Sequence, residues 1–267
     1  MNSRKEKEDL EVVSIKELFK RTISSIFLIS FALIINYLGG YYFLTAILLI
    51  LLILMFEYYK LFDIKYFDFY FFINFSFIAI CVLFTFYDLH FLIIIPFLLG
   101  ISVSSSHKLN WKVGLSSFIY FAVPTCLAIY LNVHADNGLF LITWLFVIIW
   151  SSDIAGFIIG KIIKGPKLLK SISPNKTWSG FVSSLIFAGF SSVIYAYFFI
   201  LTTHIYAFLI GAFVSLFSVM GDLFESYLKR INKKKDSSNL IPGHGGLLDR
   251  LDGFLFAIVL FWLITKF

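Results

Sequence analysis

Four carboxylates near the end of the chain have the spacing of a site that handles phosphate groups. Asp222 and Glu225 are three residues apart, and Asp249 and Asp252 repeat that spacing. Residues three apart share a helix face, so each pair presents two carboxylates together. Lysines and arginines crowd the segment between the pairs, and carboxylates that bind Mg²⁺ together with substrate phosphates have such surroundings. A purely structural cluster of ion pairs would also combine carboxylates with lysines and arginines.

The position of Asp222 favours a site for metal and phosphate over a structural cluster of ion pairs. Arg230 marks the charged edge of the same predicted helix, and at about 1.5 Å per residue Asp222 lies roughly 12 Å deeper. That depth is too great for an ordinary exposed side chain. The turn 242–246 has the sequence Pro-Gly-His-Gly-Gly, and its glycines allow backbone amides to approach a ligand closely.

An upstream helix adds a third position for a carboxylate. Asp153 stands in an apolar stretch, where a charged group is costly and normally faces the bundle interior or water. Gly156 and Gly160 follow it as a GxxxG pair, which permits close helix contact and allows a homodimer. A simple packing face with Asp153 near the interface is the alternative interpretation.

The loop that follows this helix is rich in groups that bind anions. It contains Ser173, Asn175 and Lys176 and ends where the next apolar run begins. Free backbone N–H groups and the helix dipole favour an anion at such an end. A solvated basic loop is the alternative.

These residues belong to a chain whose natural solvent is a lipid bilayer. Hydrophobic residues make up 60% of the sequence and charged residues 14%, with a mean hydropathy of +0.90, whereas soluble chains carry about 25% charged residues. Continuous apolar runs fit helices that cross about 30 Å of hydrocarbon, and a barrel would show short alternating stretches instead. We expect an all-α polytopic membrane bundle of about nine spans, at 22–38, 41–58, 69–87, 89–105, 114–132, 138–160, 180–200, 204–228 and 251–266.

The placement of basic residues supports this count. With nine spans and a cytoplasmic N-terminus, every lysine and arginine except Lys266 falls on the cytoplasmic side, as the positive-inside rule predicts. We expect an N-in, C-out protein of the cytoplasmic membrane. A basic face suits anionic lipids and phosphate-bearing ligands, so the pI of about 9.1 needs no nucleic acid to explain it.

The same pattern suggests a division of the chain into three parts. We expect a cytoplasmic arm at 1–21, N-terminal transmembrane helices at 22–132 and a C-terminal transmembrane catalytic domain at 133–267, because the polar candidate residues lie in the last part.

The polar C-terminal segment resembles the signature of the phosphatidate cytidylyltransferases, also called CDP-diacylglycerol synthases. The matching positions are Ser226-x-Leu228-Lys229-Arg230, then Lys235-Asp236, then Pro242-x-His244-Gly245-Gly246-Leu247-x-Asp249-Arg250-Leu251-Asp252. The stretches 153–161 and 173–178 are also similar to that family, whereas the N-terminal half is similar only in being hydrophobic. Gly156-Phe157 stands where the family often has Ala-Tyr. Ser179 replaces a common Glu, which puts any role of that Glu in doubt here.

The resemblance implies a membrane enzyme that makes CDP-diacylglycerol and diphosphate from CTP and phosphatidate, with its active site facing the cytoplasm. It implies Mg²⁺ or another divalent cation, in a one- or two-metal arrangement, bound by Asp222 and Asp249. Together with Lys229 and Arg250 these are the implied catalytic residues. The implied substrate-binding residues are Ser173, Asn175, Lys176, Arg230, Lys235, His244, Gly245, Gly246, Asp153, Glu225 and Asp252. For His244, stabilisation of the turn and contact with phosphate or cytidine both stay open.

Other functions would show other features. A CDP-alcohol phosphotransferase carries a DGxxAR pattern, which Asp252 and Gly253 begin but no Ala-Arg continues. A cation-coupled transporter using Asp153, Asp222 and Glu225 as ion sites is the main alternative. Transporters often have related halves with interrupted helices, whereas this chain concentrates its polar groups in one half. A scaffold without a site would leave the carboxylates unexplained.

Overall fold

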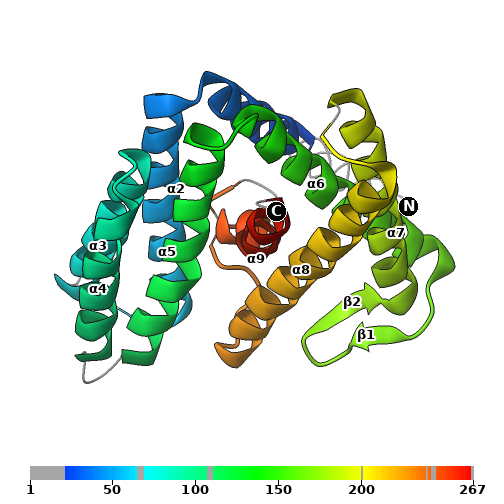
Figure 1. Cartoon of the computed structure of the whole chain (residues 1–267). Helices are drawn as coiled ribbons and strands as arrows, with labels where there is room; N and C mark the ends of the chain where they lie inside the picture. Colours follow the sequence, from blue (N-terminus) through cyan, green and yellow to red (C-terminus); the bar gives the residue numbers. More distant parts are fainter. Residues whose placement is uncertain are drawn as a thin grey trace.

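The apolar runs form helices because lipid offers the backbone no hydrogen-bond partners. The computed structural model describes residues 22–64, 69–106, 111–199, 201–238, 240–241 and 245–265. Its elements are a helix at Thr22–Leu38, α2 (Gly40–Leu61), α3 (Phe69–Phe86), the 3₁₀ turn η1 (His90–Leu92), α4 (Ile94–Ser106), α5 (Trp111–Val133), α6 (Gly138–Ile163), β1 (Lys167–Leu169), β2 (Ser173–Thr177), α7 (Trp178–Phe199), α8 (His204–Ile231) and α9 (Leu248–Thr265) (Figure 1). Each predicted apolar range therefore contains a helix.

Six of the described helices, α2, α3, α5, α6, α7 and α8, are long and apolar enough to cross a membrane. The helix Thr22–Leu38 is shorter, and α4 spans only 13 residues. The prediction of an all-helical, polytopic membrane protein is confirmed in this form. Nine crossings and the N-in, C-out orientation stay predictions, and the arm at 1–21 lies outside the described residues.

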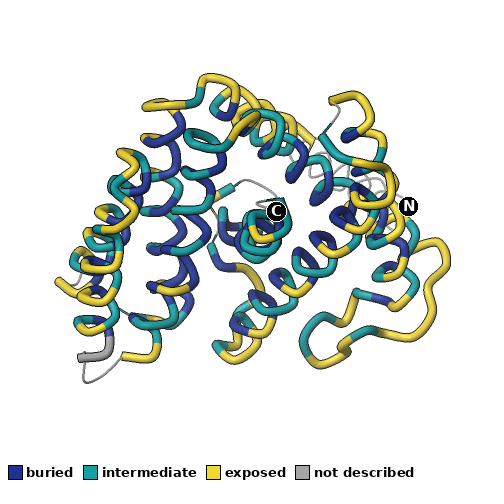
Figure 2. The backbone as a smooth tube through the Cα atoms, in the orientation of Figure 1, coloured by how far each residue is buried: buried dark blue, intermediate teal, exposed yellow. Residues whose placement is uncertain are grey.

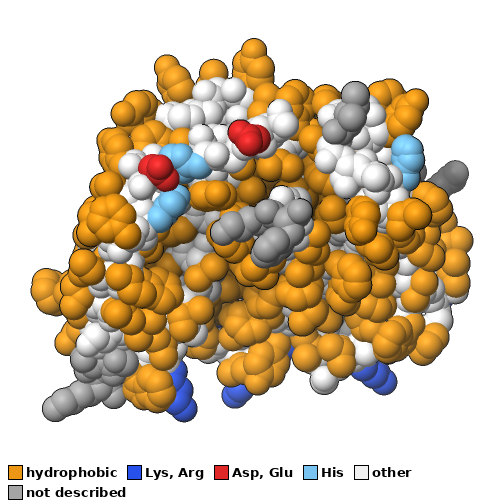
Figure 3. Space-filling model, in the orientation of Figure 1, with side chains coloured by type: hydrophobic (Ala, Val, Ile, Leu, Met, Phe, Trp, Pro, Cys, Tyr) orange, Lys and Arg blue, Asp and Glu red, His pale blue; other side chains and the backbone are white. Residues whose placement is uncertain are grey.

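The last helix, α9, lies in the middle of the molecule, between α5 on one side and α8 on the other (Figure 1). Its residues Ala257, Ile258 and Phe261 are fully buried. The buried residues lie on the inward faces of the helices, whereas the β1–β2 hairpin is largely exposed (Figure 2). Large apolar side chains cover the outside (Figure 3), which is the surface expected of helices that face lipid.

Charged groups are segregated on this surface. In the view of Figure 3, the visible lysine and arginine atoms lie at the lower edge, and the visible aspartate, glutamate and histidine atoms lie in the upper part. The C-terminal end of α8 and the β1–β2 hairpin also lie at the lower edge (Figure 1). This arrangement agrees with a single basic face, and the assignment of that face to the cytoplasm is the prediction of the positive-inside rule.

Small residues allow α8 to approach two neighbouring helices closely. A Cβ at Gly211 would collide with the backbone of Ala188 on α7. A Cβ at Gly221 would likewise collide with the backbone of Asp252 and Gly253 on α9. Small residues at helix contacts are the usual means of close packing in a membrane, where lipid tails give helices no hydrophobic reason to associate.

The GxxxG pair of α6 is used for packing within the chain. Gly156 and Gly160 lie against Gly180 on α7, and a Cβ at Gly180 would be 2.7 Å from the Gly156 carbonyl oxygen and 3.3 Å from the Gly160 Cα. A Cβ at Gly156 would be 3.5 Å from its nearest neighbours, which is ordinary contact.

Gly180→Ala is therefore expected to destabilise the protein by about 1–3 kcal/mol, the usual cost of overpacking. Gly156→Ala, on the opposite side of the same contact, is the matched control and should change stability little. Thermal unfolding of the purified variants in detergent compares the two. Equal thermal midpoints for both variants would show that the α6–α7 contact is not as close as described.

The segment between α6 and α7 forms an antiparallel hairpin instead of an irregular loop, with Lys167 paired with Thr177 and Leu169 with Ser173. Thr177 begins α7 as its N-cap, since its Oγ1 accepts the Gly180 N–H at 3.2 Å. A side-chain oxygen at this position satisfies one of the free N–H groups of the first turn. The predicted anion site at this helix end therefore has one donor fewer than the sequence suggested.

Candidate active site

Four elements meet where the hairpin approaches the ends of α8 and α9. Lys176 on β2 forms an ion pair with Asp222 on α8, with 2.5 Å between Nζ and Oδ2. Asp153 on α6 interacts electrostatically with Asp222, Lys176 and Arg250. Asp252 on α9 does so with Asp222, Asp153 and Lys176. Carboxylates that lie 69 residues apart (Asp153 and Asp222) and 30 residues apart (Asp222 and Asp252) in the sequence thus share one corner.

The close contact of α8 and α9 explains why two of these carboxylates are neighbours. Because Gly221 has no side chain, the backbone of Asp252 and Gly253 reaches the α8 backbone. Asp222 is the next residue on α8, so it comes beside Asp252. The Asp252 Oδ1 accepts the Gly253 N–H at 2.7 Å. Asp222 accepts the Ser226 hydroxyl at 3.3 Å, and its side chain is 38% exposed.

Lys229 links the two pairs of carboxylates deeper in the structure. Its Nζ lies 2.5 Å from Glu225 Oε2 and 2.6 Å from Asp249 Oδ1. The side chains of Lys229, Glu225 and Asp249 are only 11%, 0% and 7% exposed. Buried charges are stable only when they are paired, and Lys229 contacts both of these buried carboxyl groups.

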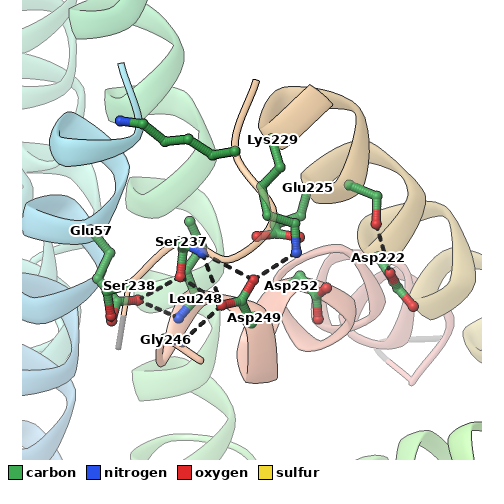
Figure 4. A network of polar contacts seen from close by, with 12 residues as sticks. Glu57, Asp222, Glu225, Lys229, Ser237, Ser238, Gly246, Leu248, Asp249 and Asp252 are labelled. Carbon is green, nitrogen blue, oxygen red and sulfur yellow. Dashed lines mark hydrogen bonds and ion pairs between the residues drawn. The ribbon is translucent and has the colours of Figure 1, made fainter. Parts of the chain in front are cut away.

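Asp249 is also the anchor of the segment that precedes α9 (Figure 4). Its Oδ2 accepts the Gly246 N–H at 2.8 Å, the Ser237 hydroxyl at 2.9 Å and the Ser237 N–H at 3.0 Å. Gly245, whose φ of +79° suits glycine, closes a small bridge with Ile241. The two predicted glycines therefore shape the backbone around Asp249.

Arg230, which is predicted to bind substrate, donates hydrogen bonds to two backbone carbonyls. Its Nε donates to the Ile172 carbonyl at 3.2 Å and its Nη1 to the Lys234 carbonyl at 3.1 Å. The bond to Ile172 fastens the turn of the β1–β2 hairpin to the end of α8, and the bond to Lys234 holds the chain that leaves α8. In this conformation Arg230 holds the hairpin that carries Lys176, and its role as a phosphate ligand stays a prediction.

The remaining predicted residues lie at the edge of the site or outside the described residues. Asn175 and Lys235 are exposed, and Ser173 is half-buried at the start of β2. Arg250 is exposed on the first turn of α9. His244 lies outside the described residues, so its two proposed roles stay open.

Glu57 on α2 belongs to the same polar network, and the sequence reasoning missed it. It is 1% exposed and accepts hydrogen bonds from Ser237, Ser238, Leu247 and Leu248 (Figure 4). One signal pointed to it, because a carboxylate inside the apolar run 41–58 is as costly as Asp153 in its own run. Its distance in sequence from the signature hid the connection.

The donor set of the corner fits a divalent cation that is shared with a phosphate ligand. Asp153, Asp222 and Asp252 are close enough to repel one another, with Lys176 as the cation bonded to Asp222. Among the described residues no group of three or more aspartate, glutamate, histidine or cysteine side chains is placed to hold a metal ion by itself. Mg²⁺ is usually bound through one or two carboxylates and substrate phosphates, so the open arrangement fits it.

The two predicted metal ligands, Asp222 and Asp249, differ in how many hydrogen bonds their carboxylates already accept. Asp222 has one lysine and one serine as partners and stays partly open. Both oxygens of Asp249 already accept hydrogen bonds from Lys229 and from the segment before α9. Asp222 is therefore the more accessible ligand of the pair.

Comparison with known proteins agrees with the composition of this corner. The family model described as "Cytidylyltransferase family" matches residues 19–267. Similar curated proteins include the phosphatidate cytidylyltransferases of Rickettsia conorii, 37% identical over 157 residues (56% of this chain and 68% of the relative), and of Rickettsia felis, 40% identical over 157 residues (56% and 69%). That of Bacillus subtilis is 38% identical over 160 residues (58% and 60%). Because the family model covers nearly the whole chain, the chain belongs to the cytidylyltransferase family.

Proposed function

We propose that this protein transfers the cytidylyl group of CTP to phosphatidate, which gives CDP-diacylglycerol and diphosphate. The observation that carries the proposal is the convergence of Asp153, Lys176, Asp222 and Asp252 at the end of the bundle where the basic residues gather. The names of the relatives support the same substrates. The family comparison lends no support to a cation-coupled transporter.

The reaction needs two anions to be brought together in line. A phosphate oxygen of phosphatidate attacks the α-phosphorus of CTP, a new P–O bond forms, and the bond to the β-phosphate oxygen breaks as diphosphate leaves. The attacking oxygen is already ionised, so no strong general base is required. The site has to neutralise charge and fix the geometry, which are the two largest contributions to such transfers.

The side chains of the corner can meet both needs. Lys176 lies on strand β2 of the hairpin and reaches Asp222 on α8, so its ammonium group is placed to bind a phosphate oxygen. Arg250, exposed on α9, adds a second cation. We propose that Asp222, with Asp249 as the second candidate ligand, holds a divalent cation, which would supply charge neutralisation and alignment of the phosphates.

The location follows from the substrates. CTP is a cytosolic nucleotide and the headgroup of phosphatidate lies at the membrane surface, so a site at the basic end of the bundle can reach both. We propose that this end faces the cytoplasm in a multi-pass protein of the cytoplasmic membrane, as the charge distribution predicts.

The direct test uses purified protein in detergent with phosphatidate, labelled CTP and Mg²⁺. We expect a labelled CDP-lipid and an equal amount of diphosphate, and we expect both to disappear when a chelator removes the metal. Diacylglycerol in place of phosphatidate is the matched control, because it lacks the attacking phosphate. Absence of product with Mg²⁺, Mn²⁺ and the other common divalent cations would overturn the proposal.

A further inference from the structure

We infer that Glu57 is a positioning residue of the active site, which from the N-terminal half of the chain holds the two described ends of the segment 237–248, at 237–238 and 247–248, in place. Four donors converge on its carboxylate. Ser238 Oγ donates to Oε1 at 2.6 Å and the Leu247 N–H to the same oxygen at 3.0 Å. The Leu248 N–H donates to Oε2 at 2.6 Å and Ser237 Oγ at 3.3 Å. Both ends of the segment are thus fastened to one group.

The arrangement requires a carboxylate at this position. Glu57 is 1% exposed, and a buried charge is tolerated only when its hydrogen bonds are complete. Leu248 is the first residue of α9, so its N–H and that of Leu247 belong to a helix N-terminus, where the helix dipole favours an anion. A neutral amide of the same shape would turn its own NH₂ group toward one pair of these donors.

Ser237 connects Glu57 to the site itself. Its hydroxyl lies between two carboxylates, 3.3 Å from Glu57 Oε2 and 2.9 Å from Asp249 Oδ2. Asp249 in turn pairs with Lys229. A shift of the 237–248 segment therefore moves the partners of Asp249 and, through it, the ion pair that links α8 with α9.

The absence of a side chain at Gly246 allows Glu57 and Ser237 to lie close to the backbone of the turn. A Cβ at Gly246 would collide with the Ser237 hydroxyl and would also lie 2.7 Å from both carboxylate oxygens of Glu57, closer than real contacts allow. The Gly246 N–H meanwhile donates to Asp249. The glycine therefore stands between two carboxylates, one from α2 and one from α9, and a side chain there would displace Glu57. This gives the second glycine of the turn a role that depends on a helix outside the signature.

The inference is tested with Glu57→Gln, Glu57→Asp and Leu51→Ala. Leu51 is a fully buried residue of the same helix and serves as the control for a loss of stability alone. The kinetic part rests on the proposed cytidylyl transfer. We expect Glu57→Gln to lower kcat at least about tenfold, because small displacements of reacting groups are costly, with a smaller change of KM for CTP. Glu57→Asp keeps the charge and should recover part of the loss.

Hydrogen exchange gives a readout that does not depend on the activity. Glu57→Gln should raise amide exchange in peptides that cover 237–248 and leave the β1–β2 hairpin unchanged. Leu51→Ala should lower the thermal midpoint while the kcat of the folded protein and the exchange at 237–248 stay as in the wild type. Ser238→Ala, which removes one donor, should act like Glu57→Gln but more weakly, and it guards against a Glu57 variant that does not fold.

A kcat of Glu57→Gln within twofold of the wild type would overturn the inference, and so would unchanged exchange at 237–248. If Leu51→Ala and Glu57→Gln have the same thermal midpoint and lose kcat equally, the inference is also overturned, since the loss of stability would then explain the effect. If the wild type makes no CDP-lipid, the proposed function fails, and the exchange measurements still decide the role of Glu57.

Discussion

Asp222→Asn is expected to lower turnover at least about a hundredfold, comparable to the loss of one essential electrostatic contact in other enzymes. Asp222 is the carboxylate on which Lys176, Asp153 and Asp252 converge, so loss of its charge removes the proposed metal ligand and releases Lys176. Initial rates of CDP-lipid formation at saturating CTP measure the effect.

The fold should survive this substitution, because Asn has the same shape and the Asp222 side chain is 38% exposed. We therefore expect a thermal midpoint close to that of the wild type. Asp88→Asn is the control for removal of an acidic group: Asp88 pairs with His90 and is 71% exposed, outside the site described above, and its replacement should leave turnover unchanged. Near-normal turnover in Asp222→Asn would show that the proposed metal site is wrong.

Asp249→Asn is expected to abolish turnover and also to destabilise the protein by about 2–3 kcal/mol, because hydrogen bonds to a charged group are lost and buried donors are left unsatisfied. Asp249 is 7% exposed and accepts from Lys229, Ser237 and Gly246. Thermal unfolding in detergent, together with the rate of CDP-lipid formation, measures both effects.

The two aspartate variants are controls for each other, since the chemical change is the same and the surroundings differ. Asp222→Asn should lose activity with little loss of stability, and Asp249→Asn should lose both. If the two variants unfold at the same temperature, Asp249 does not anchor the 237–248 segment as described. If Asp249→Asn is unstable but active, its role is structural and the metal depends on Asp222 without it.

Much of the candidate site could be predicted from residue types alone. Asp153 and Asp222 stand inside apolar helices, where a charge is costly unless it has a partner or a function. Lys176 and Asp252 lie in segments that resemble one family, and the structure brings both to Asp222. A carboxylate in an apolar run is visible without knowledge of the fold, and the roles of these residues in the reaction stay predictions.

Other features needed the packing of distant segments. Arg230 was expected to bind phosphate as part of a basic stretch, but it donates to the Ile172 and Lys234 carbonyls. The hairpin that it fastens contains two short strands with no strong alternation of apolar residues, so the sequence predicted only a loop. The partner of the Gly156–Gly160 pair was open between a second copy and another helix, and the structure provides Gly180 of α7.

The sequence by itself determined the helical membrane architecture, the approximate ranges of the helices and the segment that resembles the family signature, because hydropathy and motif spacing are local properties of the chain. Only the tertiary structure decided which carboxylate is open and which is engaged, and that Glu57 on α2 holds the segment before α9. The physical reason is that a buried charge must be satisfied by whatever donors the packing brings to it. For Glu57 those donors lie at the far end of the chain.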